Sequence, residues 1–229
     1  MRKRRPGLQQ RWSYVVNSLQ EIVPSYERAS SRISLFGDRA MRNEAVAYTV
    51  RSGSTVLDLG AGPGTMSRLI VQGGGDPVLV DVSKPMLKAS SFRNRVQAAF
   101  EYLPFRSASF NGAVAGFALR DSSDLISAVS EVARVLGPEG SFSICDLGKP
   151  DSSAKRVLLA MYLLVAPAVI GMVSAGRAGL KYASLYDTYL LTLRNSQLAS
   201  LLSHFFESVK LTELRLGGAI VVRCFRPAR

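Results

Sequence analysis

The sequence predicts an α/β fold built on a doubly wound, mostly parallel sheet, and three observations support this prediction. With 229 residues and 47% hydrophobic content, the chain can bury a full core as one domain without disulfides. Short apolar runs alternate with stretches of helical periodicity, which is the pattern of parallel strands joined by crossover helices. The first apolar run, 56–59, leads into a glycine-rich turn, where such folds bind nucleotide-type cofactors.

That turn, Gly60-Ala61-Gly62-Pro63-Gly64, precedes a helical stretch over 66–72. Glycine lacks a Cβ atom, so the backbone can take positive φ angles and approach a ligand closely. A dinucleotide-binding fingerprint would place its third glycine at position 65, where this chain has Thr65. With Asp58 ahead of it, the turn resembles the first motif of class I S-adenosylmethionine (SAM) methyltransferases. NAD binding and an ordinary strand-to-helix turn stay open as alternatives.

A second carboxylate, Asp81, ends the next apolar run, 77–81, which is typical of a buried parallel strand. An acid at this place in an α/β sheet accepts hydrogen bonds from both ribose hydroxyls of a cofactor, and NAD would suit it as well as SAM. The pattern further predicts a helix over 84–92, a short strand end over 97–101, strands over 112–117 and 141–146, and between these a helix over 125–133 capped by Ser122 or Ser123.

The two ends of the chain complete the predicted fold. Apolar spacing indicates a helix over 12–23 and a second one reaching Ala47, both of which would lie over the mouth of the cofactor site. Near the other end, Asn195 is the candidate cap of a helix through His204. The runs 209–214 and 219–225 predict a closing hairpin.

The charge of the chain is strongly unbalanced, with 29 Lys and Arg against 17 acids and a net charge of +12. Such a surface attracts anions, either nucleic acid or acidic lipid headgroups. Residues 1–11 read as a solvated basic tail without the apolar segment of a secretory signal. Cys145 and Cys224 lie in apolar runs and are expected to be buried thiols in a reducing compartment, and the single histidine disfavours a metal site.

Short segments in a particular order resemble the signatures of the ubiquinone/menaquinone biosynthesis C-methyltransferases. They are Tyr26, Leu35-Phe36-Gly37, Leu103-Pro104-Phe105, Phe110-Asn111, Phe117 to Asp121, Glu131 to Leu136, Lys149-Pro150, Leu198 to Leu202 and Gly217-Gly218. The resemblance covers nearly all of the chain after the basic tail. It implies a Rossmann-like sheet of seven strands, N-terminal helices, and a helical cap over about 151–192 inserted after the fifth strand.

The same resemblance implies a SAM-dependent methyltransferase over 12–229 that acts on a reduced polyprenyl quinone precursor. The basic tail and the uncharged stretch 157–175 together predict a cytoplasmic enzyme attached peripherally to an anionic membrane surface. No nucleic-acid partner is expected, and a homodimer stays open. The residues that it implies for cofactor binding are Tyr26, Asp58, Gly60, Gly62, Gly64, Thr65, Asp81, Val82, Met86, Glu101, Tyr102 and Phe117.

Two positions depart from the family pattern. The family usually has an aspartate two residues before Glu101, where it binds the adenine amino group, and this chain has Ala99. An acid often stands at the position of Asn111. We expect Asp81 and the glycine backbone to keep the cofactor bound, and Glu101 or a backbone carbonyl to replace the adenine contact.

Residues 157–175 carry no charge, and a transmembrane helix needs about 17 to 25 such residues. Pro167, Gly171 and Ser174 weaken a spanning helix. We expect a cap whose apolar face receives a polyprenyl tail and touches lipid, with a core helix as the second interpretation and a true span as the third. After it, Tyr182, Tyr186 and Tyr189 are candidate substrate-binding residues around a ring, with a core role as the alternative.

Arg120 and Asp121 directly follow the fourth strand, at the edge where such sheets place their chemistry. A ring carbon becomes nucleophilic when the neighbouring phenol, whose pKa is near ~10, ionises. The fixed charge of Arg120 would favour the phenolate or hold a water that takes the proton, and Asp121 is the candidate proton acceptor or relay. In the alternative, Asp121 only caps the following helix.

Three rival functions fit parts of the sequence. A methyltransferase of another lipid or small molecule is one, because the cap rather than the sheet selects the substrate. A basic nucleic-acid-binding protein is the second, although the basic residues after position 5 are dispersed and no aromatic-basic stacking motif occurs. A non-catalytic quinone-binding subunit is the third, and the intact Asp58, Gly60, Gly62 and Asp81 disfavour it.

Overall fold

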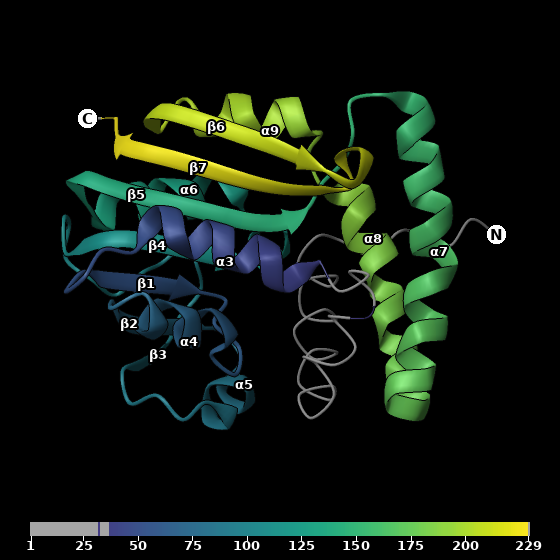
Figure 1. The fold of residues 1–229 in the computed structure, drawn as a ribbon, viewed down its shortest axis with the longest axis horizontal. Coiled ribbons are helices and arrows are strands. Elements are labelled where there is room, and N and C mark those ends of the chain that lie inside the picture. Colours follow the sequence, from purple (N-terminus) through teal and green to yellow (C-terminus); the bar gives the residue numbers. More distant parts are fainter. Residues whose placement is uncertain (1–31, 33–36, 229) are drawn as a thin grey trace.

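Seven strands form one sheet in the order β3-β2-β1-β4-β5-β7-β6 (Figure 1). The structure is a computed structural model that describes residue 32 and residues 37–228, so the predicted helix over 12–23 and Tyr26 lie outside the described residues. Neighbours among the first five strands run parallel, and β7 runs antiparallel to β5 and β6. The strands are β1 (Thr55–Leu59), β2 (Asp76–Asp81), β3 (Arg95–Gln97), β4 (Phe110–Gly116), β5 (Leu136–Leu147), β6 (Phe206–Leu214) and β7 (Ala219–Pro227). The predicted doubly wound sheet and closing hairpin are thereby confirmed.

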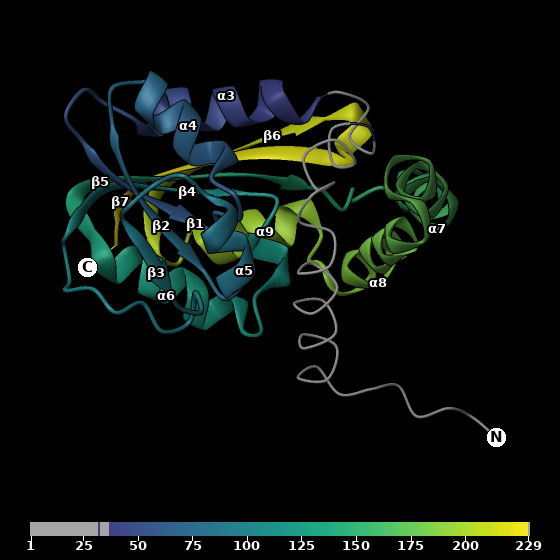
Figure 2. The same cartoon turned by 90° about the horizontal axis from the view of Figure 1, so that it is seen from below.

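Helices cover both faces of this sheet and extend past one of its edges. The α-helices of the described chain are α3 (Asp38–Thr49), α4 (Thr65–Gln72), α5 (Lys84–Ala89), α6 (Leu125–Val135), α7 (Ser153–Ala175), α8 (Ser184–Leu191) and α9 (Asn195–Leu202). Short 3-10 helices are η2 (Leu119–Asp121), η3 (Gly176–Ala183) and η4 (Arg215–Gly217). Figure 2 shows α3 and α4 on one face and α6 and α9 on the other, while α7 and α8 lie side by side beyond the carboxyl ends of the parallel strands.

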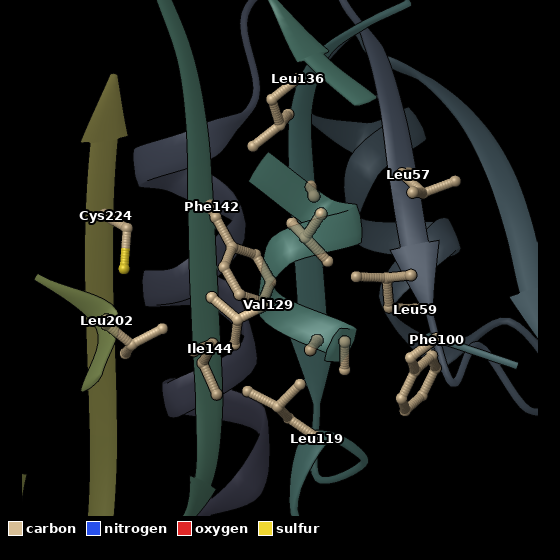
Figure 3. Close-up of a cluster of buried hydrophobic side chains, with 14 of the residues drawn as sticks. Leu57, Leu59, Phe100, Leu119, Val129, Leu136, Phe142, Ile144, Leu202 and Cys224 are labelled. Atoms are coloured by element: carbon tan, nitrogen blue, oxygen red, sulfur yellow. The ribbon is translucent and has the colours of Figure 1, made fainter. Parts of the chain in front are cut away.

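The core forms because the central strands are apolar on both faces. On one face Leu57, Leu59, Phe142 and Ile144 pack against Val129 of α6 and Leu202 of α9 (Figure 3). On the other face, Val56 and Val114 pack against Met41, Ala45 and Val46 of α3. Burial of each such side chain contributes about 1.5–3 kcal/mol, so the two layers fix the sheet that carries the site.

Three predicted boundaries move for identifiable reasons. β5 begins at Leu136 rather than at Ser141, because Leu136 pairs with Phe110 and the residues between bulge out before Ser141 pairs with Gly112. The helix predicted over 84–92 ends at Ala89, since the Arg95 guanidinium binds the carbonyl oxygens of Leu87 (2.9 Å) and Ser90 (3.0 Å). The strand predicted over 97–101 is instead Arg95–Gln97, parallel to β2.

The cap of α6 is Asp124, so the prediction of Ser122 or Ser123 is wrong. The Asp124 carboxylate accepts hydrogen bonds from the N–H groups of Ile126 (3.0 Å) and Ser127 (3.3 Å). The Ser123 hydroxyl instead donates to Oε1 of Glu101 (2.9 Å). Because Asp124 holds the cap position, the alternative in which Asp121 caps this helix is also wrong.

Asn195 is a cross-link between three segments and not the predicted cap of α9, whose N-cap is Arg194. The buried Asn195 side chain accepts the N–H of Lys149 at Oδ1 (2.7 Å). Its Nδ2 donates to Oε1 of Glu213 (2.7 Å) and to the carbonyl oxygen of Gly217 (3.0 Å). It therefore ties the start of the cap to the β6–β7 connection.

We predict that Asn195→Ala lowers the free energy of unfolding by about 1–3 kcal/mol, because it leaves buried polar groups of Lys149 and Gly217 without partners. Urea denaturation followed by circular dichroism measures the change. The matched control is Ser203→Ala on the exposed side of the same region, where loss of the bond to the Ser200 carbonyl should change stability by less than about 0.5 kcal/mol. Equal effects of the two substitutions would contradict the cross-link.

Candidate active site

The turn after β1 adopts a conformation that requires glycine at two positions. Gly60 has φ +64°, and a Cβ atom there would lie 2.3 Å from the Cβ of Ala118. Gly62 has φ +53°, and its N–H donates to Oδ2 of Asp81 (2.8 Å). Among the described residues, a Cβ on Gly62 would meet only the Met86 sulfur, at 3.9 Å, so this part of the structure leaves space beside the backbone. The turn is therefore shaped for close approach of a ligand, as the sequence predicted.

Asp81, at the carboxyl end of β2, joins this turn to the next loop. Its Oδ1 accepts the N–H of Ser83 (2.8 Å), and the Ser83 hydroxyl in turn accepts the N–H of Met86 to cap α5. Burial raises the pKa of Asp81, and the two backbone hydrogen bonds oppose this shift. A carboxylate has about four acceptor positions, so two remain for ligand hydroxyl groups.

Asp58 has a buried oxygen that lacks a partner among the described residues. The Ser67 hydroxyl donates to its Oδ2 (2.6 Å), whereas Oδ1 accepts no hydrogen bond. Burial raises the pKa of Asp58 to about 6, although the Ser67 hydrogen bond and the charge of Arg42 lower it. A buried acceptor without a donor is costly, which indicates that a ligand donor completes this position.

Phe117, at the end of β4, has φ +60°, a conformation that a non-glycine residue rarely adopts. Its N–H donates to the carbonyl oxygen of Cys145 (2.7 Å), and the Arg42 guanidinium lies 4.8 Å from the centre of its ring. Strain of this kind costs about 1–3 kcal/mol and clusters at functional sites. Phe117 thus belongs to the same carboxyl edge as Asp58 and Asp81.

Arg120 and Asp121 lie in η2 at this edge, and Asp146 of β5 fixes Arg120. The Asp146 carboxylate forms a buried ion pair with the Arg120 guanidinium and accepts the Arg120 backbone N–H (3.4 Å). Nε of Arg120 lies 3.9 Å from Oδ1 of Asp121. Asp146 was not among the predicted site residues, although it stands near the carboxyl end of an apolar strand just as Asp58 and Asp81 do.

Negative charge accumulates at this edge. Burial raises the pKa of Asp121 to about 6; Arg120 lowers it, and the charges of Asp146 and Asp81 raise it further. The charge of Asp81 also raises the pKa of Asp58. A cationic ligand would relieve this repulsion, and an acid with a pKa near 6 is a competent proton acceptor at neutral pH.

The other predicted site residues divide into three groups. Gly64, with φ +88°, and Thr65 begin α4, which no described side chain caps, and Val82 and Met86 follow Asp81 at the site. Glu101 is committed to structure, since its Oε1 accepts hydrogen bonds from the Ser123 and Asp124 N–H groups (2.7 and 3.0 Å), and Tyr102 beside it is exposed. Tyr182, Tyr186 and Tyr189 lie apart from these, on η3 and α8, where Tyr182 and Tyr189 are buried.

Comparisons with known proteins agree with this geometry. A family described as a methyltransferase domain matches residues 57–144. The chain is 33% identical to a demethylmenaquinone methyltransferase of Paenarthrobacter aurescens over 75% of this chain and 70% of that protein. It is 27% identical to the protein of the same name from Tropheryma whipplei over 90% and 88% of the two chains. The chain belongs to the quinone-biosynthesis family of class I SAM-dependent methyltransferases.

Solved structures show the same fold at low identity. A SAM-dependent methyltransferase of Thermotoga maritima matches with a TM-score of 0.65 and 18% identity, covering 92% of this chain and 99% of that chain. The plantazolicin methyltransferase BpumL, solved in complex with a triazolic desmethylPZN analog and SAH, matches with a TM-score of 0.64 and 14% identity over 97% and 98% of the two chains. These matches show the fold alone, and it is membership of a family of SAM-dependent methyltransferases that makes SAM the cofactor and excludes the NAD alternative.

The residues at the carboxyl edge fit SAM, which is a sulfonium cation that carries an amino acid and a ribose. Asp81 keeps acceptor positions for the ribose hydroxyls, and the partnerless oxygen of Asp58 beside the glycine turn suits a donor of the methionine part. When bound, SAM supplies an electrophilic methyl group. Tyr26 lies outside the described residues, and its role stays a prediction, as do those of Glu101 and Tyr102.

We predict that SAM binds more tightly as the pH rises from about 5 to about 7.5, because a cation binds the Asp58 carboxylate better than the acid, whose pKa is about 6. Asp58→Asn should weaken binding by about tenfold and flatten this dependence, since a charge-assisted hydrogen bond contributes about 1.5–3 kcal/mol. Calorimetric titration at each pH measures both effects. Asp76→Asn, an exposed acid at the opposite end of the sheet, is the control, and an equal loss there would contradict the assignment.

Proposed function

We propose that this methyltransferase methylates a ring carbon of a reduced polyprenyl quinone precursor, demethylmenaquinol or a related benzoquinol. One observation carries the proposal: 117–121, a segment particular to the quinone family, is the one that brings Arg120 and Asp121 to the cofactor edge. The relatives named demethylmenaquinone methyltransferase support the same substrate class. A methyltransferase of another small molecule is the second candidate. The sheet holds the cofactor, whereas the cap selects the substrate, so the same sheet can serve different substrates.

In the proposed reaction, the ring carbon forms a bond to the methyl carbon while the methyl–sulfur bond breaks. The phenol beside that carbon loses its proton before the transfer; afterwards the ring carbon loses its own proton and the oxygen regains one, so that one proton is released overall. Asp121 is suited to accept a proton, since its pKa of about 6 leaves it mostly ionised at neutral pH and makes it a stronger base than an ordinary carboxylate. Positioning of the two reactants supplies the remainder of the rate enhancement, up to about 7–11 kcal/mol in favourable cases.

Arg120 has a divided role in this proposal. Its guanidinium is shared between Asp146 and Asp121, so only part of its charge is available to stabilise a phenolate. The ion pair with Asp146 fixes the guanidinium in place, which a flexible exposed arginine would not achieve. Asp146 is therefore a positioning residue for Arg120 and, through its charge, one determinant of the Asp121 pKa.

The cap is proposed to hold the quinol and its tail at the cytoplasmic surface of the membrane. Tyr182 and Tyr189 are buried where η3 and α8 pack on α7, and Lys149 lies 5.5 Å from the Tyr189 ring centre. The Tyr189 hydroxyl donates to the Arg156 carbonyl (3.2 Å) and its ring is buried, so Tyr189 would shape the substrate pocket by fixing α8 on α7 rather than by offering a free hydroxyl. Tyr186, which is only partly buried, is the third proposed contact.

The experiment that tests the substrate class is incubation with isotope-labelled SAM and one acceptor at a time, followed by mass spectrometry. Demethylmenaquinol and demethylated benzoquinol with full tails, a tail-less naphthoquinol, and a panel of small phenols form the set. Label in the ring of a tailed quinol supports the proposal. Label only in small phenols would establish the second candidate instead.

We predict that the single-turnover rate at saturating SAM rises through about pH 6 and levels off, because the acceptor Asp121 must be ionised. Asp121→Asn should lose this limb and about 100-fold or more in rate. Asp146→Asn should move the limb to lower pH, since it removes a charge that raises the Asp121 pKa. A limb that persists in Asp121→Asn would show that another group accepts the proton.

We predict that Arg120→Met leaves SAM affinity nearly unchanged and lowers the methyl-transfer rate, because the lost charge stabilises the transition state. Arg120→Lys should restore the rate only in part, since lysine keeps the charge without the planar fork. The deficit should shrink as the pH approaches the phenol pKa near ~10. In Arg120→Met the buried Asp146 carboxylate loses its ion-pair partner, and adding Asp146→Asn removes that unpaired charge. Wild-type rates in this double variant would show that Arg120 has only a structural role.

A further inference from the structure

Helix α7 is apolar on all sides, yet only one side is covered by the described protein. From Val157 to Ala175 it has no charged residue, and its segment Ser153–Ser174, with a mean hydropathy of 2.3, is long and apolar enough to cross a membrane. Only 17% of that segment is buried. An all-apolar helix is normally buried in a core or in lipid, so the exposed side needs a further partner.

The exposed side forms a continuous stripe along the helix. The α7 stripe consists of Val157, Met161, Leu164, Val165, Val169 and Met172, each about half exposed (49–59%). Apart from the adjacent pair Leu164 and Val165, they follow one another at steps of three or four residues. This spacing places their side chains on one face of the helix. None of them carries a hydrogen-bonding group, so the stripe offers only aliphatic and thioether surface.

The opposite side of α7 fixes how the stripe points. Gly171 lies so near η3 that a Cβ atom there would be 2.2 Å from the Gly179 carbonyl oxygen. Leu163 is buried on this side, and Tyr189 of α8 bonds to the backbone of α7. Both views show α7 as the outermost element, beyond the carboxyl edge of the sheet (Figures 1 and 2). The stripe therefore faces away from the folded body.

The basic residues around α7 favour an anionic bilayer over a second copy of the chain as the partner of the stripe. Lys155 in the first turn of α7, Arg177 just after its end and Arg215 of η4 are exposed, and α7 contains no acid. Burial raises the pKa of Tyr162 on α7, and Arg215 lies close enough for its charge to oppose this shift. Apposition of two copies would bring these like charges together, whereas an anionic bilayer attracts them, at about 1 kcal/mol per basic residue near the surface. A lipid surface also requires no polar groups on the stripe.

We propose that the α7 stripe docks this methyltransferase on an anionic lipid bilayer, with α7 lying in the interface rather than crossing it. A crossing helix would carry η3 and α8, which pack along it with Arg177 and Asp187, into hydrocarbon, where their polar groups would lack partners. Lying flat buries only the stripe and leaves the flanking basic residues among the headgroups. This orientation places the carboxyl edge of the sheet, with the SAM site, on the membrane side of the molecule.

Vesicle sedimentation of the full chain tests the inference. The wild type should sediment with vesicles that contain phosphatidylglycerol, less with pure phosphatidylcholine, and less as salt is added. Met161→Glu with Val165→Glu should lower partitioning at least tenfold while the basic tail stays intact. The matched control is Val71→Glu with Ile126→Glu, two exposed apolar residues on α4 and α6, which should bind like the wild type.

Each outcome is decisive once SAM titration shows that both double variants remain folded. Wild-type partitioning of the stripe variant would overturn the proposal. Protein that resists extraction by carbonate would show a spanning helix. A stripe variant that turns a dimer into a monomer in sedimentation velocity, with unchanged vesicle binding, would make the stripe a self-association surface. Because no acceptor is used, these results do not depend on the proposed reaction.

Discussion

The Asp81 carboxylate is the constraint on which the site depends. It binds the backbone N–H of Gly62 on one side and that of Ser83 on the other, so it fixes both the glycine turn after β1 and the start of α5. The positive φ of Gly62 and the register of β1 with β2 bring these groups into reach, which is why a glycine and a strand-terminal acid are both needed.

The concentration of acids around Asp81 has an electrostatic cost that the chain offsets unevenly. Asp146 is compensated by the Arg120 guanidinium, whereas Asp58 and Asp121 retain raised pKa values. A folded state that holds carboxyl groups with raised pKa values loses stability as pH rises through the interval from their ordinary value to about 6. The same electrostatic repulsion favours a cationic ligand, and in the proposed reaction it leaves Asp121 as a base near neutral pH, so stability is given up in favour of binding and of the proposed catalysis.

The cap formed by α7, η3 and α8 has two surfaces of different character. Its inner surface is closed by aromatic rings and by the glycine contact between α7 and η3, and its outer surface is left aliphatic. The Asn195 cross-link joins this cap to the β6–β7 connection, so the hairpin of α7 and α8 is held to the sheet at its base. The α7 stripe, which we propose docks on a membrane, and the cofactor edge of the sheet are thereby kept in a fixed relation.

The sequence alone determined the parts of this protein that depend on local chemistry. Apolar runs and helical spacing predicted the parallel sheet, its closing hairpin and most of its helices, and the glycine turn with Asp58 and Asp81 predicted the cofactor edge, because turn conformation and strand burial are encoded by neighbouring residues. The tertiary structure decided what depends on residues far apart in the chain. The Arg120–Asp146 ion pair, the role of Asn195, the commitment of Glu101 to the loop before α6 and the outward face of α7 all arise from contacts between distant segments, which no local pattern records.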